Sequence, residues 1–394
     1  NLGKALDRLS KHQEALESFD KATQLQRDLA AAWAERGLVL VSLDRYKEAL
    51  ESFYKVTQLQ TDEAEKLGIA EAQISALKEL MDYTEDVKAD RNNTTAWFNR
   101  GVALHDLERY EEALESYDAV TQLECDDVKV WSNRGVALSR LGRCEEALES
   151  FDKAIELQPD LADVWSNRGE PLFRLGKHKE ALESYSKAVE LQPNDEEFWY
   201  NRALVLIKLE RYEEALENYD RAIQLQPGLA LAWGNRGWLL SKFGRHEEAF
   251  QSLDRAVELQ PNDAVAWHNR AVSLVGLGRS DEALESHDRA AQLQPDSVEI
   301  WMSRGSTLIR LGRYEEALES LNKAIRLQPG LVGTWFGRGM ALERLGRYEE
   351  ALEDLNKAVQ LQPDLAAVWS NRGLVLAKLD RYEEALDDYD RSIQ

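Results

Sequence analysis

The chain has 394 residues, of which 72 are acidic and 49 are basic, and its formal net charge is −23. Hydrophobic residues make up 43% of it and include 11 Trp, 13 Tyr and 9 Phe, a composition that predicts an ordered core and excludes a disordered chain. The negative charge argues against a nucleic-acid binder, and no apolar stretch is long enough to span a membrane.

Tryptophan marks an internal repeat. From Trp97 to Trp369 it recurs with a step of 34 residues, and Trp33 precedes Trp97 by 64 residues, which is one such step plus a shorter one of 30. Repetition at this period predicts stacked supersecondary units rather than separate globular domains.

Each repeat contains two apolar stripes at helical spacing. In the repeat 128–161, Trp131 and Gly135 lie on the first stripe, and Ala147 and Phe151 lie on the second. A Leu-Gly-Arg turn separates the two, and Pro-Asp ends the second helix. A single helical hairpin cannot bury its apolar face, so neighbouring hairpins must stack.

In chain order, we expect N-terminal repeats over residues 1–63, an irregular short repeat over 64–93 and a regular array over 94–394. The chain opens and stops within a repeat, so we expect it to be a fragment of a longer protein. Within the regular array, Pro171 lies inside a first helix, where a proline removes one backbone hydrogen bond. We expect a local bend there.

The short repeat 64–93 lacks four residues where other repeats carry the turn between their helices. We therefore expect one continuous helix over about 66–88, because the lost segment is close to one helical turn. A shortened but still bent hairpin is the alternative. A fused helix should separate the first repeats from the regular array and expose an apolar stripe for self-association or for another protein. The residues of this stripe are Ile69, Ala72, Ala76, Leu80, Tyr83 and Val87.

The repeat resembles the tetratricopeptide repeat, whose pattern is Trp-x2-Leu-Gly-x2-Tyr, then Ala-x3-Phe, then Pro. The match extends over essentially the whole chain, with Arg in place of the Leu after Trp and Leu in place of the Tyr. The resemblance implies an all-α fold, a right-handed superhelical solenoid of antiparallel helix pairs. It also implies that the first helix of each pair lines the concave side.

No catalytic constellation is visible in the sequence. Three of the six His, His12, His178 and His246, occupy the same turn position in different repeats and cannot meet at one metal, and no phosphate-binding loop or nucleophile motif occurs. Two cysteines, Cys125 and Cys144, are too few for a disulfide scaffold and fit a reducing cytoplasm. We predict no enzyme activity, no catalytic residue, no metal site, no cofactor and a cytoplasmic location.

The sixth position of the repeat is asparagine in most first helices. This pattern resembles the asparagine ladder inside the superhelix of O-linked N-acetylglucosamine transferase, which implies that the amides hold the backbone of an extended peptide. An amide offers one donor and one acceptor, which suits a peptide group. The alternative is that each amide bonds to a neighbouring helix. The residues are Asn99, Asn133, Asn167, Asn201, Asn235, Asn269 and Asn371.

The same helix face carries basic and large apolar residues. The basic ones at the thirteenth position favour an acidic ligand, unless they pair with neighbouring carboxylates. The apolar ones suggest contact sites, with mere groove lining as the alternative. The basic residues are Arg140, Arg174, Lys208 and Lys242, and the apolar ones are Phe173, Tyr200, Ile207 and Trp238. Arginine at the seventh position adjoins the packed face, and we predict that it forms structural ion pairs or stacks on a ring.

These patterns lead to three hypotheses. The first is a non-enzymatic interaction scaffold that holds an extended protein segment in its groove. The second is the sensor or substrate-recruiting arm of a larger multidomain enzyme or signalling ATPase, which would differ in the flanking sequence. The third is a purely structural array without a ligand, which a broad peptide library would reveal by failing to bind.

Overall fold

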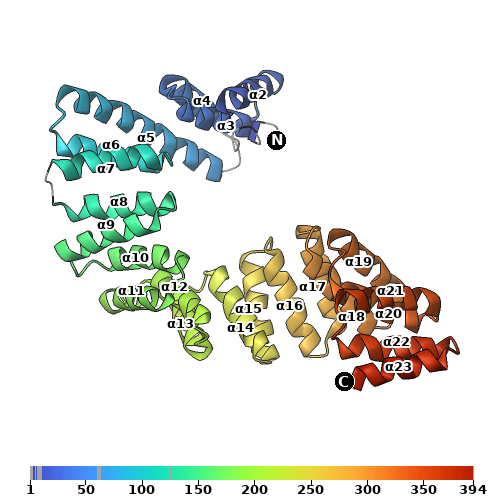
Figure 1. Ribbon diagram of the computed structural model, residues 1–394. Coiled ribbons are helices and arrows are strands. Elements are labelled where there is room, and N and C mark those ends of the chain that lie inside the picture. Colours follow the sequence, from blue (N-terminus) through green and yellow to red (C-terminus); the bar gives the residue numbers. More distant parts are fainter. Residues whose placement is uncertain (1–2, 5, 7–10, 60–63, 124–125, 394) are drawn as a thin grey trace. The chain divides into compact units, whose positions relative to one another are not determined.

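The computed structural model describes residues 3–4, 6, 11–59, 64–123 and 126–393. Of residues 64–70 it describes the backbone but not the side chains. Every regular element in these ranges is an α-helix, which confirms the all-α prediction. The chain forms two compact parts, residues 1–194 and 195–394, and each is described by itself (Figure 1). Cys125 and the side chain of Ile69 lie outside the described residues, and Cys144 is a buried free thiol. The division at 63/64 and 93/94 stays a prediction.

Successive helices pack as hairpins in both parts. The N-terminal part contains α2 (His12–Leu25), α3 (Ala30–Ser42), α4 (Tyr46–Gln58), α5 (Ala64–Ala89), α6 (Thr94–Asp106), α7 (Tyr110–Gln122), α8 (Val128–Arg140), α9 (Cys144–Leu157), α10 (Ala162–Arg174) and α11 (His178–Leu191). The C-terminal part contains α12 (Glu196–Lys208), α13 (Tyr212–Leu225), α14 (Ala230–Lys242), α15 (His246–Leu259), α16 (Ala264–Gly276), α17 (Ser280–Leu293), α18 (Val298–Arg310), α19 (Tyr314–Leu327), α20 (Val332–Arg344), α21 (Tyr348–Leu361), α22 (Ala366–Lys378) and α23 (Tyr382–Ile393).

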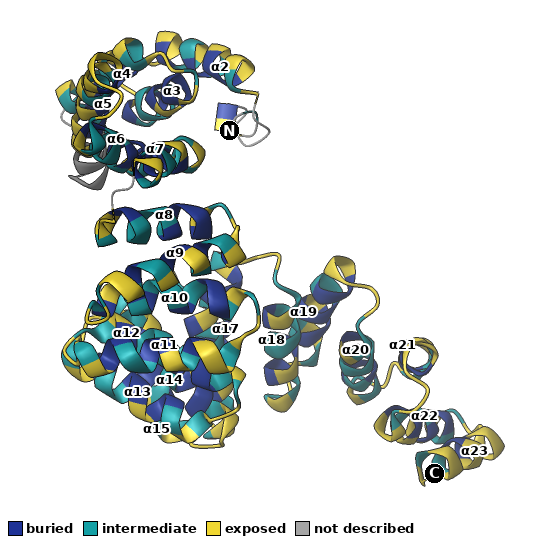
Figure 2. Ribbon diagram, turned by 60° about the vertical axis from the view of Figure 1, so that its left-hand side comes forward, coloured by how far each residue is buried: buried dark blue, intermediate teal, exposed yellow. Residues whose placement is uncertain are grey.

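A glycine on the first helix lets the two helices of a hairpin approach closely. A Cβ atom added to Gly135 on α8 would lie 2.7 Å from the ring of Phe151 on α9. Phe151 and its neighbour Ala147 are fully buried. The turn between the helices then needs a left-handed residue, which is Gly142 with a φ of 75°. Figure 2 shows the buried residues on the helix sides that face neighbouring helices.

In most repeats the arginine at the seventh position joins two repeats, as predicted for a structural role. Arg134 Nε donates to Asp118 Oδ1 of the preceding repeat at 2.7 Å, and its Nη1 donates to Ser150 Oγ of its own second helix at 2.6 Å. Its guanidinium also lies over the Trp131 ring, 5.8 Å from the centroid. Arg36, Arg168, Arg236, Arg270 and Arg304 are bonded in the same way to a preceding aspartate and to their own serine.

In the last two repeats the carboxylate and the neutral partner of this arginine have exchanged places. Arg338 binds Asp354 of its own second helix through Nε at 2.7 Å, and its Nη1 donates to Asn322 of the preceding repeat. Arg372 does the same with Asp388 and Asn356. The arginine therefore keeps one carboxylate and one neutral partner in either version.

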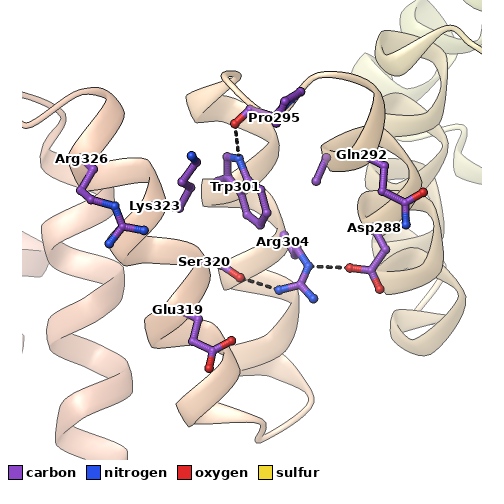
Figure 3. A pocket seen from close by; sticks show the side chains of 10 residues that line it. Asp288, Gln292, Pro295, Trp301, Arg304, Glu319, Ser320, Lys323 and Arg326 are labelled. Atoms are coloured by element: carbon purple, nitrogen blue, oxygen red, sulfur yellow. Dashed lines mark hydrogen bonds and ion pairs between the residues drawn. The ribbon is translucent and has the colours of Figure 1, made fainter.

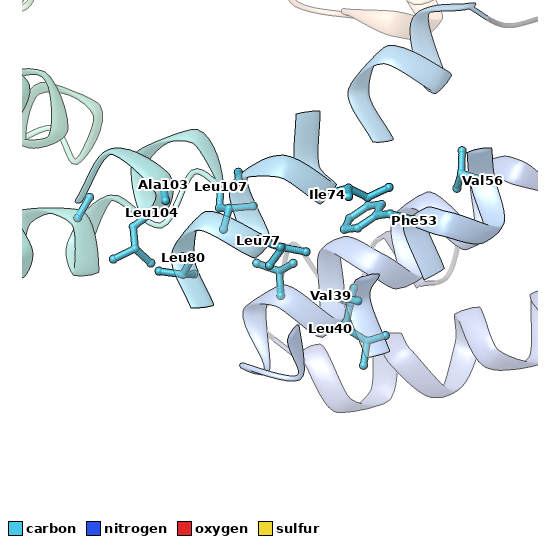
Figure 4. Close-up of a cluster of buried hydrophobic side chains, with 14 of the residues drawn as sticks. Val39, Leu40, Phe53, Val56, Ile74, Leu77, Leu80, Ala103, Leu104 and Leu107 are labelled. Atoms are coloured by element: carbon cyan, nitrogen blue, oxygen red, sulfur yellow. The ribbon is translucent and has the colours of Figure 1, made fainter. Parts of the chain in front are cut away.

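Helix α5 is the continuous helix that we expected for the short repeat, and it has 26 residues. Our expectation of an exposed stripe is wrong, because Leu77 and Leu80 are buried in one core with residues of α3, α4 and α6 (Figure 4). Of the expected stripe, Ala76 and Val87 are also buried, while Ala72 is exposed. The helix therefore joins the first repeats to the following ones rather than separating them.

Pro171 does not interrupt its helix. Helix α10 runs from Ala162 to Arg174, with Pro171 buried near its C-terminal end. It has 13 residues, as does α8. A bend relative to α8 stays a prediction.

Candidate functional site

The first helices of neighbouring hairpins form the inner side of each part. Helix α8 contacts α10, and α14 contacts α16, in addition to their hairpin partners. Neighbouring second helices approach each other less closely within the described ranges. In a curved row of hairpins, the side on which neighbours come closer is the concave one. We call this side the first-helix face.

All seven predicted asparagines are half-buried on this face, but they are not equivalent. Asn99, Asn167 and Asn269 make no side-chain hydrogen bond to other described residues, and Asn201 makes none within the C-terminal part. Asn235 Nδ2 donates to Tyr200 Oη at 3.1 Å, so this amide is used inside the protein, as the alternative supposed. Asn371 Nδ2 donates to the carbonyl of Ala367 in its own helix at 2.8 Å. Asn133 lies beside the buried phenol of Tyr117, and its amide opposes the burial that raises the pKa of that phenol.

The predicted basic residues are exposed, and the structure divides them by their partners. Arg174 is occupied, since Nη2 binds Glu170 at 2.7 Å and Nη1 donates to the Ser139 carbonyl at 3.0 Å. Lys242 Nζ donates to Tyr212 Oη at 3.0 Å. Arg140 and Lys208 have no carboxylate within ion-pair distance in the described part of the chain. These two therefore remain available to an acidic ligand, and Lys242 keeps its charge because its partner is a neutral phenol.

Three of the four predicted apolar contact residues are half-buried packing residues. The Phe173 ring lies 5.3 Å from that of His178, and the Tyr200 ring lies 5.9 Å from that of Tyr219. Burial raises the pKa of Tyr200, and Ile207 is half-buried as well. Trp238 is different because it is 38% exposed, with Lys242 Nζ 5.7 Å from its ring centroid.

A cavity of about 290 Å³ opens on the first-helix face of the N-terminal part, between α6, α8 and α10. Asn133 lies in its wall beside Ser132 and Lys129, and Phe98 and Val164 supply apolar surface. This combination of a few polar groups and apolar walls suits a side chain of a bound segment.

Family models now identify the repeat. Models described as tetratricopeptide repeat match residues 1–64, 128–161, 195–262 and 268–332, and one described as TPR repeat matches 101–142, 169–210 and 344–380. The chain is a tetratricopeptide repeat (TPR) protein. TPR arrays form scaffolds that bind other proteins or peptides, and the fold is typically non-catalytic.

Solved TPR structures are similar to part of this chain. YrrB, a TPR protein with an unusual peptide-binding site, is 27% identical over 48% of this chain and 96% of its own, with a TM-score of 0.43. MamA from Desulfovibrio magneticus RS-1 is 24% identical over 43% and 95%, with a TM-score of 0.41. A TPR protein from Parabacteroides merdae ATCC 43184 is 21% identical over 63% and 98%, with a TM-score of 0.47. No curated protein matches this chain.

Three exposed apolar residues of the TPR array were not singled out from the sequence. Leu231 on α14 is 52% exposed, and Val265 and Val272 on α16 are 59% and 39% exposed. With Trp238 they occupy the second and ninth positions of two consecutive repeats. The signal was present in the sequence, because elsewhere the second position is mostly small, polar or charged.

The described residues contain neither a cluster of metal-ligating side chains nor a membrane-spanning helix. No group of three or more His, Cys, Asp or Glu side chains in those ranges could hold a metal ion. No helix within them has the length and apolar character needed to cross a membrane.

Proposed function

We propose that this TPR protein is a non-enzymatic scaffold whose first-helix face binds an extended protein segment. The observation that carries the proposal is the cavity of about 290 Å³ whose wall includes Asn133. It combines an amide with apolar walls on the side where first helices approach each other. YrrB, whose TPR array is described as having a peptide-binding site, supports the proposal by similarity alone.

The amides supply the polar part of the proposed recognition. Asn99 and Asn167 lie on the helices that flank α8, and neither is bonded within the described protein. Each could exchange a donor and an acceptor with one peptide group. Each bond contributes only about 1 kcal/mol net, so several must act together.

A second part of the proposal concerns the C-terminal part. Leu231, Trp238, Val265 and Val272 provide exposed apolar surface on α14 and α16. A tryptophan such as Trp238 often dominates the binding energy of an interface. Arg140 in the N-terminal part and Lys208 in the C-terminal part would favour acidic residues in the bound segment. The recruiting arm of a larger enzyme would use the same face, and that alternative stays a prediction, as does the cytoplasmic location.

The test is binding of a broad peptide library to the whole chain, followed by affinity measurement for the recovered peptides. The triple variant Asn99→Ala, Asn133→Ala and Asn167→Ala should weaken those that bind the N-terminal part at least tenfold, since about 3 kcal/mol is at stake. Asn371→Ala is the matched control, because its amide is already bonded to Ala367. Equal affinity of the triple variant, with unchanged melting, would remove the amides from the mechanism. A library without any binder would favour the purely structural array.

A further inference from the structure

A cavity on another side of the C-terminal part carries a separate inference. It has a volume of about 560 Å³ and lies between α17, α18 and α19. Its wall includes Trp301, Arg304, Lys323 and Arg326 (Figure 3). None of these residues is among those that we placed on the exposed surface of the first-helix face. The inference therefore does not depend on the proposed function.

The second helix of a repeat normally supplies a hydrogen-bond acceptor for its own cation at this place. A Lys or Arg at the twenty-sixth position binds a Glu or Gln three residues later. Lys187 Nζ lies 2.9 Å from Glu190, and Arg255 Nη1 lies 2.8 Å from Glu258. The same pairing occurs at Lys55 with Gln58, Lys153 with Glu156, Arg221 with Gln224 and Arg289 with Gln292.

Helix α19 breaks this rule. The residue three positions after Lys323 is Arg326, whereas every other repeat except the short one at 64–93 has Glu or Gln there. Lys323 thus loses its acceptor and gains a second cation beside it. Neither side chain has a carboxylate within 4.0 Å among the described residues of the C-terminal part. Two like charges on adjacent helical turns repel each other, and a bound anion would relieve that repulsion.

The other charged groups of the cavity leave this positive charge in place. Asp288 is bound by Arg304 Nε at 2.6 Å, so its carboxylate is already neutralised. Glu319 is exposed and is the remaining acidic residue of the wall. The two positive charges of Lys323 and Arg326 exceed the single negative charge of Glu319 by one. The chain as a whole has a net charge of −23. A local positive site in an acidic protein selects a single anion and disfavours a polyanion.

Trp301 adds an apolar wall. Its Nε1 donates to the Pro295 carbonyl at 2.9 Å, so the indole offers a ligand its ring carbons rather than its N–H. Figure 3 shows Lys323 and Arg326 on one side of Trp301, and Asp288 and Gln292 on the other. An arginine fork and a lysine point charge suit the oxygens of a phosphoryl or carboxylate group.

We propose that this cavity binds an oxyanion carried on a protein side chain, a phosphoryl or carboxylate group held by Lys323 and Arg326 against Trp301. The side chain that carries the anion packs on the indole. The site is separate from the first-helix face, so the two surfaces can bind different segments of one partner or two partners at once.

The test uses the whole chain with 15N-labelled tryptophan and follows the indole signal of Trp301, assigned with Trp301→Phe. The probes are inorganic phosphate, phenyl phosphate and phenylacetate. Phenyl phosphate should bind more tightly than inorganic phosphate because its ring packs on the indole. Comparison with phenylacetate shows whether the site prefers a phosphoryl or a carboxylate group.

The variants make the proposal falsifiable. Arg326→Gln restores the residue that most repeats have, so it should fold normally and weaken phenyl phosphate at least fivefold. Glu319→Gln should strengthen binding about twofold or more, since it removes the opposing charge. Arg255→Gln is the matched control, because it alters a cation that already has Glu258, and it should leave the affinity unchanged. If Arg326→Gln binds like the wild type, or if all tryptophan signals shift alike, the proposal is wrong.

Discussion

Arg109 and Tyr46 lie 63 residues apart in the sequence, yet Arg109 Nη1 donates a hydrogen bond to Tyr46 Oη. Each residue belongs to the turn region of a hairpin, and the chain of α5 lies between the two hairpins. Arg109 also forms ion pairs with Asp44 and Glu112. The hairpins on either side of α5 are therefore joined at their turns as well as through the shared core.

Replacing Arg109 tests this junction. Its side chain is only 13% exposed, so Arg109→Met should lower the free energy of unfolding by about 2 kcal/mol through the unpaired phenol and carboxylates. Urea unfolding monitored by circular dichroism measures the change. The control is Arg143→Met, at the same repeat position, because among the described residues Arg143 pairs only with Glu146 on the surface, so it should contribute less than about 0.5 kcal/mol. Equal losses in the two variants would contradict a special role for Arg109.

The exchanged carboxylate of the last repeats leads to a second prediction. Asp354→Asn leaves the guanidinium of Arg338 without a carboxylate and should cost about 2 kcal/mol. Adding Asn322→Asp should recover most of that loss, because it recreates the arrangement of Arg304 with Asp288. A double-mutant cycle in urea measures the coupling. Additive effects of the two changes would show that the carboxylates act independently.

His287 predicts a pH dependence of stability. It is 1% exposed on α17, and burial lowers its pKa to about 3, with His268 and Arg304 adding to the effect. Below about pH 6.5 the unfolded chain takes up a proton that the folded chain refuses, so stability should fall with decreasing pH until about pH 3. The slope is at most about 1.4 kcal/mol per pH unit for this one group.

The measurement is urea unfolding between about pH 6.5 and 5, where most carboxylates stay ionised. His287→Leu places the residue that Leu253 and Leu321 represent in neighbouring repeats, and it should flatten the slope. Part of the slope should persist, because burial also lowers the pKa of His268. An unchanged slope in His287→Leu would show that the dependence arises elsewhere.

Pro171 gives a prediction in the opposite direction. Pro171→Ala restores a backbone N–H that can bond to the Asn167 carbonyl, and alanine occupies the same position in several repeats, as at Ala137. We expect a gain of about 1–2 kcal/mol, less than the full cost of an interior proline, since the residue lies near the helix end and proline also restricts the unfolded chain. The gain should come with slower hydrogen exchange of the amides around position 171. A loss of stability would mean that the pyrrolidine ring is needed for packing.

Much of the fold was predictable because the same residues mark the helices and the turn in most repeats. Trp131, Gly135 and the Leu-Gly-Arg turn recur often enough to place every hairpin. The continuous α5 followed from an unbroken apolar phase across 64–93. Its burial did not follow, because the sequence does not show that α4 and α6 both lie against Leu77 and Leu80.

The candidate site was less predictable because the residues repeat while their surroundings do not. Identical residues at identical repeat positions have different partners, as Asn235 and Asn269 show. That difference depends on Tyr200, which lies one repeat earlier and has no counterpart in most repeats. The division of the chain into two compact parts after residue 194 was not predicted from the sequence either.

The alternative locations of the carboxylate restrict how this array can evolve by copying its own units. If the repeat 332–365 followed one that ends like 264–297, Arg338 would meet two carboxylates. If the repeat 298–331 followed one that ends like 332–365, Arg304 would meet none. Duplication, deletion or recombination between repeats of unlike polarity therefore changes the number of carboxylates around this arginine, whereas between repeats of matching polarity it does not. The repeat 298–331 can join the two arrangements, because Arg304 uses Ser320 with the preceding Asp288, whereas Asn322 accepts from Arg338 of the next repeat.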